Sequence, residues 1–250
     1  LRKSGEIVGS INSVTLRKES TGRFISIQTE REFEQQVHPS TNEIGIDVGI
    51  ARFATFSDGS FIEPINAFKS LQDKLARSQR LLSRKVKFSA NWKKQKKIVS
   101  RIHNMIANIR RDFLHKLSTK ISDSQAVVYV EDLKVSSMSR SASGAVENPG
   151  KNVKAKSGLN RSILDQGWSM FREMLAYKIA WRGGRLVAVP PAYTSQRCPE
   201  CGHVAKENRK SQSEFCCVEC GHSSNADHVG AINVLRAGQA HCGELQLCAQ

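Results

Sequence analysis

The stretch Glu43-Ile44-Gly45-Ile46-Asp47-Val48-Gly49-Ile50 alternates apolar residues with small or polar ones. Such an alternation, with a period of two, is typical of a strand that buries one face. Residues 51–56 continue the apolar pattern, and Phe61-Ile62 follows after the turn sequence Ser57-Asp58-Gly59. Because Asp-Gly between apolar runs is a strong hairpin signal, residues 43–64 are predicted to form a meander of three strands.

Helical patterns follow this meander. Residues 67–122 carry apolar residues at spacings of three and four, interrupted between Lys85 and Asn91, which predicts two helices. One apolar stripe is expected to consist of Ile98, Ile102, Met105, Ile109, Phe113, Leu117 and Ile121. Residues 161–182 also show helical spacing, which stops at Gly183-Gly184.

Two further strands and a last helix complete the pattern. Residues 125–131 and Leu186–Val189 are short apolar runs, which predict buried strands, and a short helix is expected around Ala231–Leu235. Residues 134–160 are rich in Ser, Gly, Lys and Asn, and a mobile loop is expected there.

The order of these elements indicates the fold class. A three-strand meander, helix, strand, helix, strand and closing helix is the order of a ribonuclease-H-like fold. We therefore expect an α/β architecture with a mixed sheet and helices, interrupted by a small cysteine-rich module. A short β segment precedes it, with strand-like runs at Val14-Thr15-Leu16 and Phe24-Ile25-Ser26-Ile27.

Two Cys-x2-Cys pairs separated by fifteen residues predict a zinc ribbon. The predicted zinc ligands are Cys198, Cys201, Cys217 and Cys220. Cys216 is a competing choice, but it would not keep the two-residue gap to Cys220. Gly202 and Gly221 follow the second cysteine of each pair, where a tight turn often needs positive φ. Four thiolates close the coordination shell, so this zinc is expected to be structural.

Three acids stand at positions that the expected fold brings together. Asp47 lies within the first strand, Glu131 ends a buried strand, and Asp227 starts the last helix. Each acid taken alone is more often a cap or a surface residue. Three converging carboxylates, however, need cations to remain ionised, and oxygen ligands suit Mg²⁺ or Mn²⁺. Two such ions can hold and cleave a phosphodiester.

The chain is strongly basic, with 38 Lys and Arg residues against 23 Asp and Glu residues and a formal charge of +15. Such a charge favours a polyanionic partner, most commonly nucleic acid. Candidate phosphate contacts within the helical segment are Lys93, Lys94, Lys97, Arg101 and Arg110. An ordinary solvated helix surface is the alternative. The sequence contains no apolar run of about 18 residues, the length that would predict a membrane span. It also shows no signal-peptide pattern, so a cytoplasmic location is expected.

Taken together, these motifs resemble the insertion-sequence OrfB or TnpB family, transposon-encoded nucleases related to type V CRISPR effectors. The resemblance covers about residues 5–236 and rests on motifs in a characteristic order. They are Gly45–Ile50, Val130–Leu133, Tyr193–Gln196, Cys198–Gly202, Phe215–Gly221 and Ala226-Asp227.

The resemblance implies a RuvC-like nuclease domain, interrupted by a zinc ribbon, that cuts DNA. It implies a guide RNA copied from the transposon end, target DNA as the substrate, and Asp47, Glu131 and Asp227 as catalytic acids holding Mg²⁺ or Mn²⁺. Two departures from the family pattern occur: Val229 stands where an Asn is usual, and Gly230 replaces an expected Ala. The oligomeric state, the guide sequence and the target-adjacent motif stay open.

The expected domain organisation has four parts. Residues 1–40 would be part of a β-rich wedge, 41–190 a RuvC-like domain with a basic helical insertion, 191–224 the zinc ribbon, and 225–250 the closing helix and tail. Family members usually carry a longer stretch ahead of this start, so an N-terminal truncation is expected.

Two other function classes stay open. A non-catalytic nucleic-acid-binding regulator, or a decayed transposase remnant, would fit the expected truncation and Val229. A strand-transferring transposase would use the same type of acids.

Overall fold

The computed structural model describes residues 5–19, 21–32, 34 and 36–247, with side chains described as far as Cys242. The outermost parts of the predicted segments 1–40 and 225–250 therefore lie outside the described residues. The chain forms two compact units, one of Leu1–Gln35 with Ala67–Arg111, the other of Gln36–Asn66 with Asp112–Gln250. Hydrophobic clusters form within each unit.

The first unit contains a hairpin and a pair of helices. Strands β1 (Ser10–Lys18) and β2 (Arg23–Glu30) pair antiparallel, and all of their residues are exposed. The hairpin therefore has no core of its own, and the two strand-like runs predicted there are confirmed as strands. Helix α1 (Ala67–Ser83) and the first part of α2 (Ala90–Ser124) share an apolar cluster. The predicted break between the two helices is confirmed.

The apolar stripe predicted along α2 is partly wrong. Ile98 and Met105 are 44% and 46% exposed, whereas Val99, Ile102 and Ile106 are buried against α1. The buried positions 99, 102 and 106 also follow helical spacing, so the spacing alone allowed two neighbouring stripes. The packing of α1 decides between them.

The second unit is built on a five-stranded mixed sheet in the order β5-β4-β3-β6-β7. The strands are β3 (Glu43–Val48), β4 (Ala54–Phe56), β5 (Phe61–Ile62), β6 (Val127–Glu131) and β7 (Arg185–Val189). The first three form an antiparallel meander, with Gly59 at φ +87° in the predicted turn, and β3, β6 and β7 run parallel. This topology confirms the predicted ribonuclease-H-like fold.

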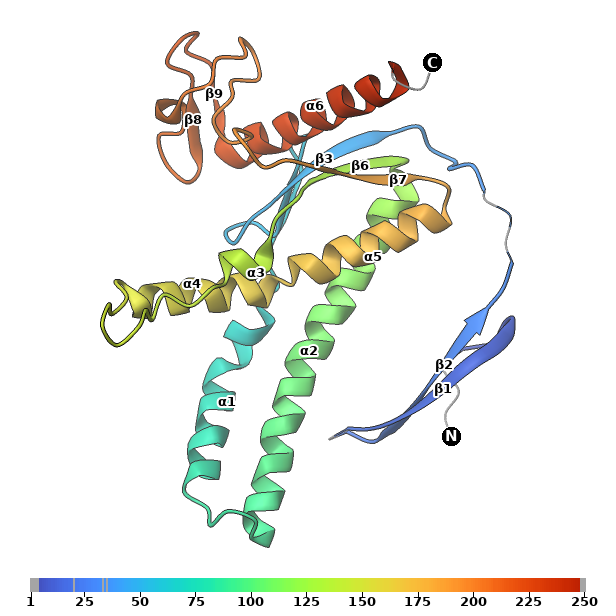
Figure 1. Ribbon diagram of the computed structural model, residues 1–250, viewed down its shortest axis with the longest axis vertical. Coiled ribbons are helices and arrows are strands. Elements are labelled where there is room, and N and C mark those ends of the chain that lie inside the picture. The colour runs from blue at the N-terminus through green and yellow to red at the C-terminus, as the bar shows by residue number, and fades with distance from the viewer. Residues whose placement is uncertain (1–4, 20, 33, 35, 248–250) are drawn as a thin grey trace. The chain divides into compact units, whose positions relative to one another are not determined.

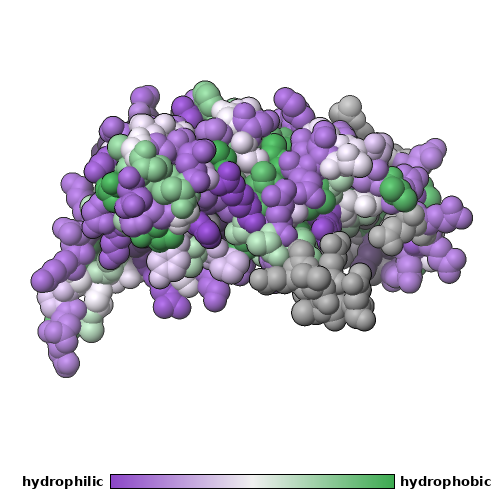
Figure 2. Space-filling model, turned by 90° about the horizontal axis from the view of Figure 1, so that it is seen from above, coloured by the Kyte–Doolittle hydropathy of each residue, from purple (hydrophilic) through white to green (hydrophobic). Residues whose placement is uncertain are grey.

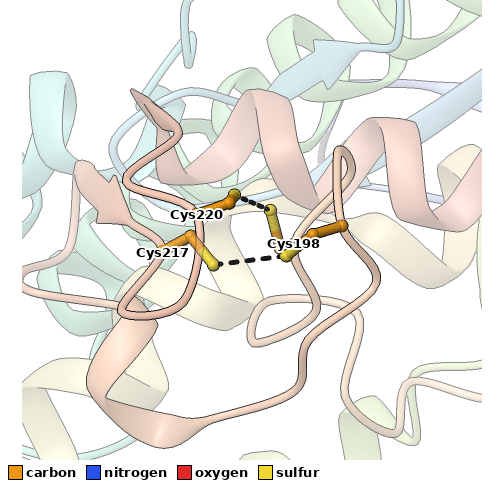
Figure 3. Close-up of side chains that lie close together, drawn as sticks. Cys198, Cys217 and Cys220 are labelled. Carbon is orange, nitrogen blue, oxygen red and sulfur yellow. Dashed lines mark hydrogen bonds between the residues drawn. The ribbon is translucent and has the colours of Figure 1, made fainter.

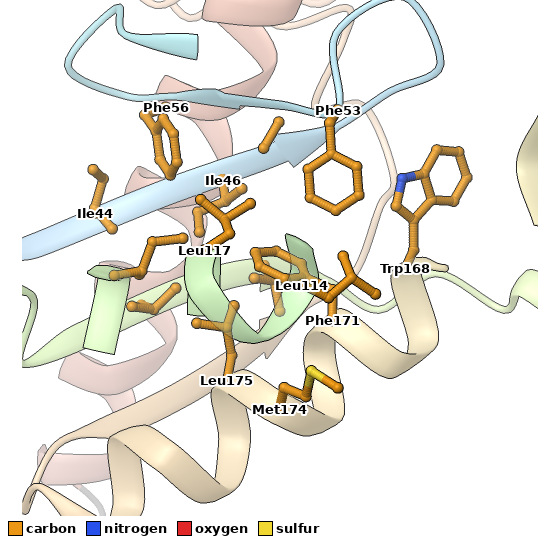
Figure 4. Packing of buried hydrophobic residues seen from close by; sticks show 14 of the residues in the cluster. Ile44, Ile46, Phe53, Phe56, Leu114, Leu117, Trp168, Phe171, Met174 and Leu175 are labelled. Carbon is orange, nitrogen blue, oxygen red and sulfur yellow. The ribbon is translucent and has the colours of Figure 1, made fainter. Parts of the chain in front are cut away.

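Helices cover both faces of this sheet, as Figure 1 shows for α5 (Trp168–Trp181) and α6 (Ala226–Leu247). The main core lies between the sheet and α5 together with the last part of α2 (Figure 4). On the strands this core takes alternate residues, such as Ile44 and Ile46 of β3. Their neighbours Gly45 and Asp47 therefore face α6, since successive strand residues point to opposite faces.

The segment predicted as a mobile loop, 134–160, contains helices instead. Helix α3 (Val135–Met138) and the first half of α4 (Val153–Gln166) lie within it. Two hydrogen bonds tie the segment together, because Lys156 Nζ donates to Met138 O at 2.7 Å and Asn160 Nδ2 to Ser139 O at 2.9 Å. The polar composition of this segment predicted a loop, because it gives no signal for these hydrogen bonds between distant residues.

Two other helix predictions need correction. The helix expected over 161–182 is divided at Gly167, whose φ of +74° separates α4 from α5. The closing helix α6 extends well beyond the predicted Ala231–Leu235. Within the cysteine-rich module, 191–225, the structure has a short 3-10 turn (Lys206–Asn208) and strands β8 (Glu214–Cys216) and β9 (Ser223–Asn225).

Among the described residues, no helix has the combined length and apolar character that a bilayer span requires. On the face shown in Figure 2, hydrophilic residues predominate and hydrophobic residues form smaller groups between them.

A glycine pair tests how closely α6 lies against β3. A Cβ added at Gly45 would be 2.3 Å from Ala231 O and 2.7 Å from Leu235 N, both backbone atoms of α6. We expect Gly45→Ala to lower the free energy of unfolding by about 1–3 kcal/mol, as overpacking usually does. Denaturant unfolding measures this change.

Gly158→Ala is the matched control, because Gly158 lies inside α4 and a Cβ there meets nothing within 4 Å. That substitution should stabilise the protein by about 0.5–1 kcal/mol through helix propensity. Equal effects of the two substitutions would contradict the close approach of α6 to β3.

Candidate active site

The three predicted acids lie on the sheet face that α6 covers or on α6 itself. Gly45 of β3 pairs in parallel register with Tyr129 of β6. Two residues further along each strand stand Asp47 and Glu131, on the same face of neighbouring strands. Asp227 is the second residue of α6, the helix that packs on this face. The fold therefore brings all three acids to one end of the sheet.

Burial and neighbouring charges shift the pKa values of two of these acids. Burial, followed by the negative charges of Glu131 and Asp227, raises the pKa of Asp47 to about 8, against an ordinary value near 4. The Arg209 charge and the Val48 N–H act in the opposite direction. Burial also raises the pKa of Glu131. A cation at this place would therefore favour the ionised form of both carboxylates.

The three acids are not drawn into a tight cluster. Among the described His, Cys, Asp and Glu side chains, only the four cysteines form a group with all ligand atoms within 4.8 Å of one another. The oxygens of Asp47, Glu131 and Asp227 therefore do not all lie within this distance of one another.

Arg209 is the cation that faces these acids. Its Nη2 lies 3.7 Å from Asp227 Oδ1, and its charge lowers the pKa of both Asp47 and Glu131. The guanidinium is held in place by backbone carbonyls, with Nη2 donating to Gln212 O at 3.0 Å and Nε to Ser211 O at 3.3 Å. All three of these residues lie between the two cysteine pairs, so the cysteine-rich module supplies this charge.

A hydrogen-bonded chain holds Glu131. Thr194 is buried and its Oγ1 donates to Glu131 Oε1 at 2.5 Å. This hydrogen bond partly offsets the rise that burial causes in the pKa of Glu131. The backbone of this loop is held from α6, because Asn233 Nδ2 donates to Thr194 O and to Arg197 O, each at 2.7 Å. One buried amide thus connects the helix that carries Asp227 to the loop that orients Glu131.

The two departures from the family pattern, Val229 and Gly230, lie near the start of α6. A Cβ added at Gly230 would be 2.9 Å from Asp47 Oδ2, so the glycine leaves room for the carboxylate. Val229 is fully buried and packs with Cys198, Phe215 and Cys217. The valine side chain therefore joins the apolar core of the cysteine-rich module.

The sulfur atoms of the four predicted zinc ligands all lie within 4.8 Å of one another, and Figure 3 labels three of these residues, Cys198, Cys217 and Cys220. Cys198 Sγ lies 3.6 Å from Cys220 Sγ, and Cys201 Sγ lies 3.6 Å from Cys217 Sγ. Zinc–sulfur bonds of about 2.3 Å in a tetrahedron require sulfur atoms about 3.8 Å apart. The donor set and its spacing therefore fit a zinc ion.

The two cysteine pairs lie in two separate turns with the same hydrogen-bond pattern. Cys198 N donates to His203 O and Cys217 N to His222 O, both at 2.8 Å. Gly202 and Gly221 have φ values of +76° and +75°, which confirms the prediction of positive φ at these two glycines. Backbone N–H groups of Cys220 and Glu219 lower the pKa of Cys217 to about 6, whereas burial and the neighbouring thiols raise the pKa of Cys220.

The predicted phosphate contacts all lie on α2, in the first unit. Lys93, Lys94, Lys97 and Arg101 are exposed, and Arg110 is half-buried. Lys93, Lys97 and Arg101 are spaced by four residues and so share one helix face. The carboxylates belong to the other unit.

Arg209 and Thr194 are the residues of this site that sequence reasoning missed. Arg209 stands in the spacer between the cysteine pairs, where charged residues are common, and no local pattern marks it. Thr194 lies in the Tyr193–Gln196 motif quoted for the family resemblance, which was the available signal.

Comparisons with known proteins agree with this geometry. Residues 25–142 match the OrfB_IS605 family, described as "Probable transposase", and residues 168–234 match the "Cas12f1-like, TNB domain". The second match contains all four cysteines, Arg209 and Asp227.

Two curated relatives extend over nearly all of this chain. One, "Putative RNA-guided DNA endonuclease InsQ" of Escherichia coli (strain K12), is 58% identical over 98% of this chain and 61% of its own length. A "Putative RNA-guided DNA endonuclease" of Streptomyces pristinaespiralis is 35% identical over 93% of this chain and 54% of its own length. The chain thus spans between half and two thirds of these relatives.

The fold also has a counterpart among solved structures. A cryo-EM structure of a CRISPR-Cas12f ternary complex matches 89% of this chain and 44% of that chain, with a TM-score of 0.50 and 19% sequence identity. At this identity the likeness supports the fold alone. The two family matches and the relatives, by contrast, confirm the resemblance of this chain to the insertion-sequence OrfB/TnpB family.

Proposed function

We propose that this chain carries the catalytic part of an RNA-guided, divalent-metal-dependent DNA endonuclease of a transposable element. The observation that carries the proposal is the placement of Asp47, Glu131 and Asp227 at one end of the sheet. Relatives of 58% and 35% identity bear the name RNA-guided DNA endonuclease, which supports the same activity here.

Asp47, Glu131 and Asp227 are the residues that would hold Mg²⁺ or Mn²⁺, because their oxygens are the ligands that such ions prefer. Ions bound there would supply positive charge to the scissile phosphodiester and activate the attacking water. Part of the rise in the pKa of Asp47 comes from the negative charges of Glu131 and Asp227, which a bound cation would offset.

Arg209 and Thr194 complete the proposed site. The Arg209 guanidinium is placed to stabilise negative charge on the phosphate, as preorganised donors do in phosphoryl transfer. Thr194 holds Glu131 through its 2.5 Å hydrogen bond and is a positioning residue. Zinc on the four cysteines would fix the module that carries Arg209.

Guide RNA from the transposon end and target DNA are the proposed partners, with Lys93, Lys94, Lys97, Arg101 and Arg110 as phosphate contacts. We assign residues 1–40 to a wedge segment, 41–190 to the RuvC-like domain with its basic insertion, 191–224 to the zinc ribbon, and 225–250 to the closing helix and tail.

Val229 favours a second candidate function, a nucleic-acid-binding regulator without catalysis. The family usually has a polar Asn at this position, and here the side chain is apolar and buried. Such a protein would bind nucleic acid with strong salt dependence and would show no hydrolysis in Mg²⁺.

The nuclease proposal predicts that Asp47→Ala abolishes cutting. With co-purified RNA retained, wild-type protein should cut single-stranded DNA in Mg²⁺ and not in EDTA. The variant should cut at least a hundredfold more slowly, because even outer partners of metal ligands contribute about 10–100-fold. DNA binding should stay within about threefold of wild type.

Asp112→Ala is the control for this experiment, since Asp112 is an exposed acid paired with Lys116 on α2. Undiminished cutting by Asp47→Ala would refute the assignment. If wild-type protein that is folded and loaded with zinc fails to cut, the regulator becomes the better reading.

The zinc assignment predicts one zinc ion per chain by elemental analysis. Cys217→Ser should lose the ion and lower the melting temperature, because structural zinc contributes directly to folding. Cys216→Ser is the matched control, since Cys216 is the adjacent thiol outside the group of four. Equal zinc content in the two variants would show that the ligand set is wrong.

The raised pKa of Asp47 predicts a pH-dependent stability. The folded-state value of about 8 lies above the unfolded value of about 3.9. Between these pH values the folded state binds more protons, so the free energy of unfolding falls as pH rises. Asp47→Asn removes this titration and should melt several degrees above wild type at pH 8 in EDTA; 1 kcal/mol corresponds to about 2–4 °C.

The difference between Asp47→Asn and wild type should shrink toward pH 5, where the titration is incomplete. Mg²⁺ should raise the melting temperature of wild type more than that of the variant. Parallel melting curves for the two proteins from pH 5 to 8 would contradict the electrostatic analysis.

A further inference from the structure

Two aromatic side chains lie against each other where α1 and α2 meet, one in the connecting turn and one in the first turn of α2. The ring centroids of Phe88 and Trp92 are 5.4 Å apart, with an interplanar angle of 51°. Phe88 is 73% exposed, and the neighbouring Val86 is 79% exposed. These side chains therefore present apolar surface to solvent at the end of a helical pair.

The backbone of this turn holds Phe88 in an unusual conformation. Its φ of +68° lies in the left-handed region, which bulky residues rarely adopt. Ser89 then caps α2, accepting a hydrogen bond from Trp92 N at 3.2 Å. Unfavourable backbone conformations of this kind concentrate at functional sites, and this one places an aromatic ring where it buries little surface.

The surroundings of the ring pair are strongly positive. No Asp or Glu occurs between Asp73 and Asp112. The same stretch carries thirteen cationic side chains, at Lys74, Arg77, Arg80, Arg84, Lys85, Lys87, Lys93, Lys94, Lys96, Lys97, Arg101, Arg110 and Arg111. Lys96 Nζ lies 5.0 Å from the centre of the Trp92 ring, close enough for a cation–π interaction.

A cavity of about 940 Å³ adjoins the rings within the same unit. Phe88, Trp92, Lys93 and Lys97 line one side, and the turn of the β1–β2 hairpin lines the other. That turn adds Lys18 and Arg23, with Glu19 as the acid in the lining. The cavity thus combines aromatic faces with a net positive charge.

We propose that this aromatic tip binds an unpaired segment of a polynucleotide, with a base stacked on Phe88 and Trp92 and the adjoining phosphates on Lys93, Lys96 and Lys97. Stacking requires an exposed base face, which a duplex offers only at its ends, so the ligand is single-stranded. Aromatic stacking combined with a positive groove is the general mode of binding single strands. Neither contact depends on the sugar, so DNA and RNA should bind alike.

This binding site goes beyond the proposed cleavage and does not use the acids of the second unit. Binding is therefore measured in EDTA, where no hydrolysis is expected. A failure of cutting and a failure of stacking can then be observed separately.

The test uses the full chain, freed of co-purified RNA, and a labelled 20-nucleotide strand of DNA or RNA of the same sequence. The dissociation constant is measured by anisotropy over a series of salt concentrations. Phe88→Ala should weaken binding about five- to a hundredfold, the usual loss per stacked base, with an unchanged salt slope. Phe88→Tyr should restore binding, because it keeps the ring.

Charge and shape controls separate the two parts of the site. Lys93→Gln should lower the magnitude of the salt slope by about 0.7, the value for one phosphate contact on a single strand. Leu81→Ala removes another exposed apolar side chain, 48% exposed on α1, and should bind as wild type. Circular dichroism of each variant checks that the helices are retained.

Fluorescence locates the contact. The chain has three tryptophans, of which Trp168 is buried and Trp181 is 63% exposed. Quenching on binding should disappear in Trp92→Phe, while the affinity stays close to that of wild type. Unchanged affinity of Phe88→Ala, quenching that survives in Trp92→Phe, or tighter binding of blunt duplex than of single strand would each overturn the proposal. The proposal would also be overturned if Phe88→Ala weakened binding to anionic lipid vesicles but not to the single strand.

Discussion

The close contact between α6 and β3 is the constraint on which the second unit depends. At Gly45 the helix backbone lies so near the strand that a single methyl group would meet Ala231 O at 2.3 Å, and at Gly238 one would meet the Tyr129 ring at 1.9 Å. Glycine is used here for its lack of a side chain, since only a bare backbone permits this separation. The contact brings the first turn of α6, with Asp227, over the strand positions of Asp47 and Glu131. A helix held farther away would leave Asp47 and Glu131 without Asp227.

Bringing three acids together is unfavourable, and the rest of the unit limits that cost. The pKa of Asp47 rises to about 8, so protonation relieves the repulsion in the absence of a cation. Arg209 offsets part of the negative charge, and Thr194 satisfies one oxygen of Glu131. Both residues come from the segment around the cysteine module, whose core includes Val229 of α6. The four-cysteine module therefore acts on the acids through placement of Arg209, which gives it a role beyond local folding.

The first unit differs from the second in its high density of positive charge. A run from Lys74 to Arg111 without a single acid concentrates positive charge in this unit. Such a surface is stable in solution but repels itself, and a polyanion relieves that repulsion. The Phe88–Trp92 pair at the end of these helices adds a preference for unpaired bases that charge alone would not supply.

The sequence by itself determined the strands and the two cysteine pairs, because each depends on short-range spacing, whereas the three acids were predicted from the order of the elements and the family resemblance. Alternation in residues 43–50, the Asp58-Gly59 turn and the two Cys-x2-Cys pairs are local patterns that hold in any context. The tertiary structure alone decided which stripe of α2 is buried, that residues 153–160 are helical, and that α6 continues to Leu247. These features depend on contacts between distant segments, such as Lys156 with Met138. Arg209 reaches the acids for the same reason: its position is set by the folded ribbon, and no neighbour in sequence indicates it.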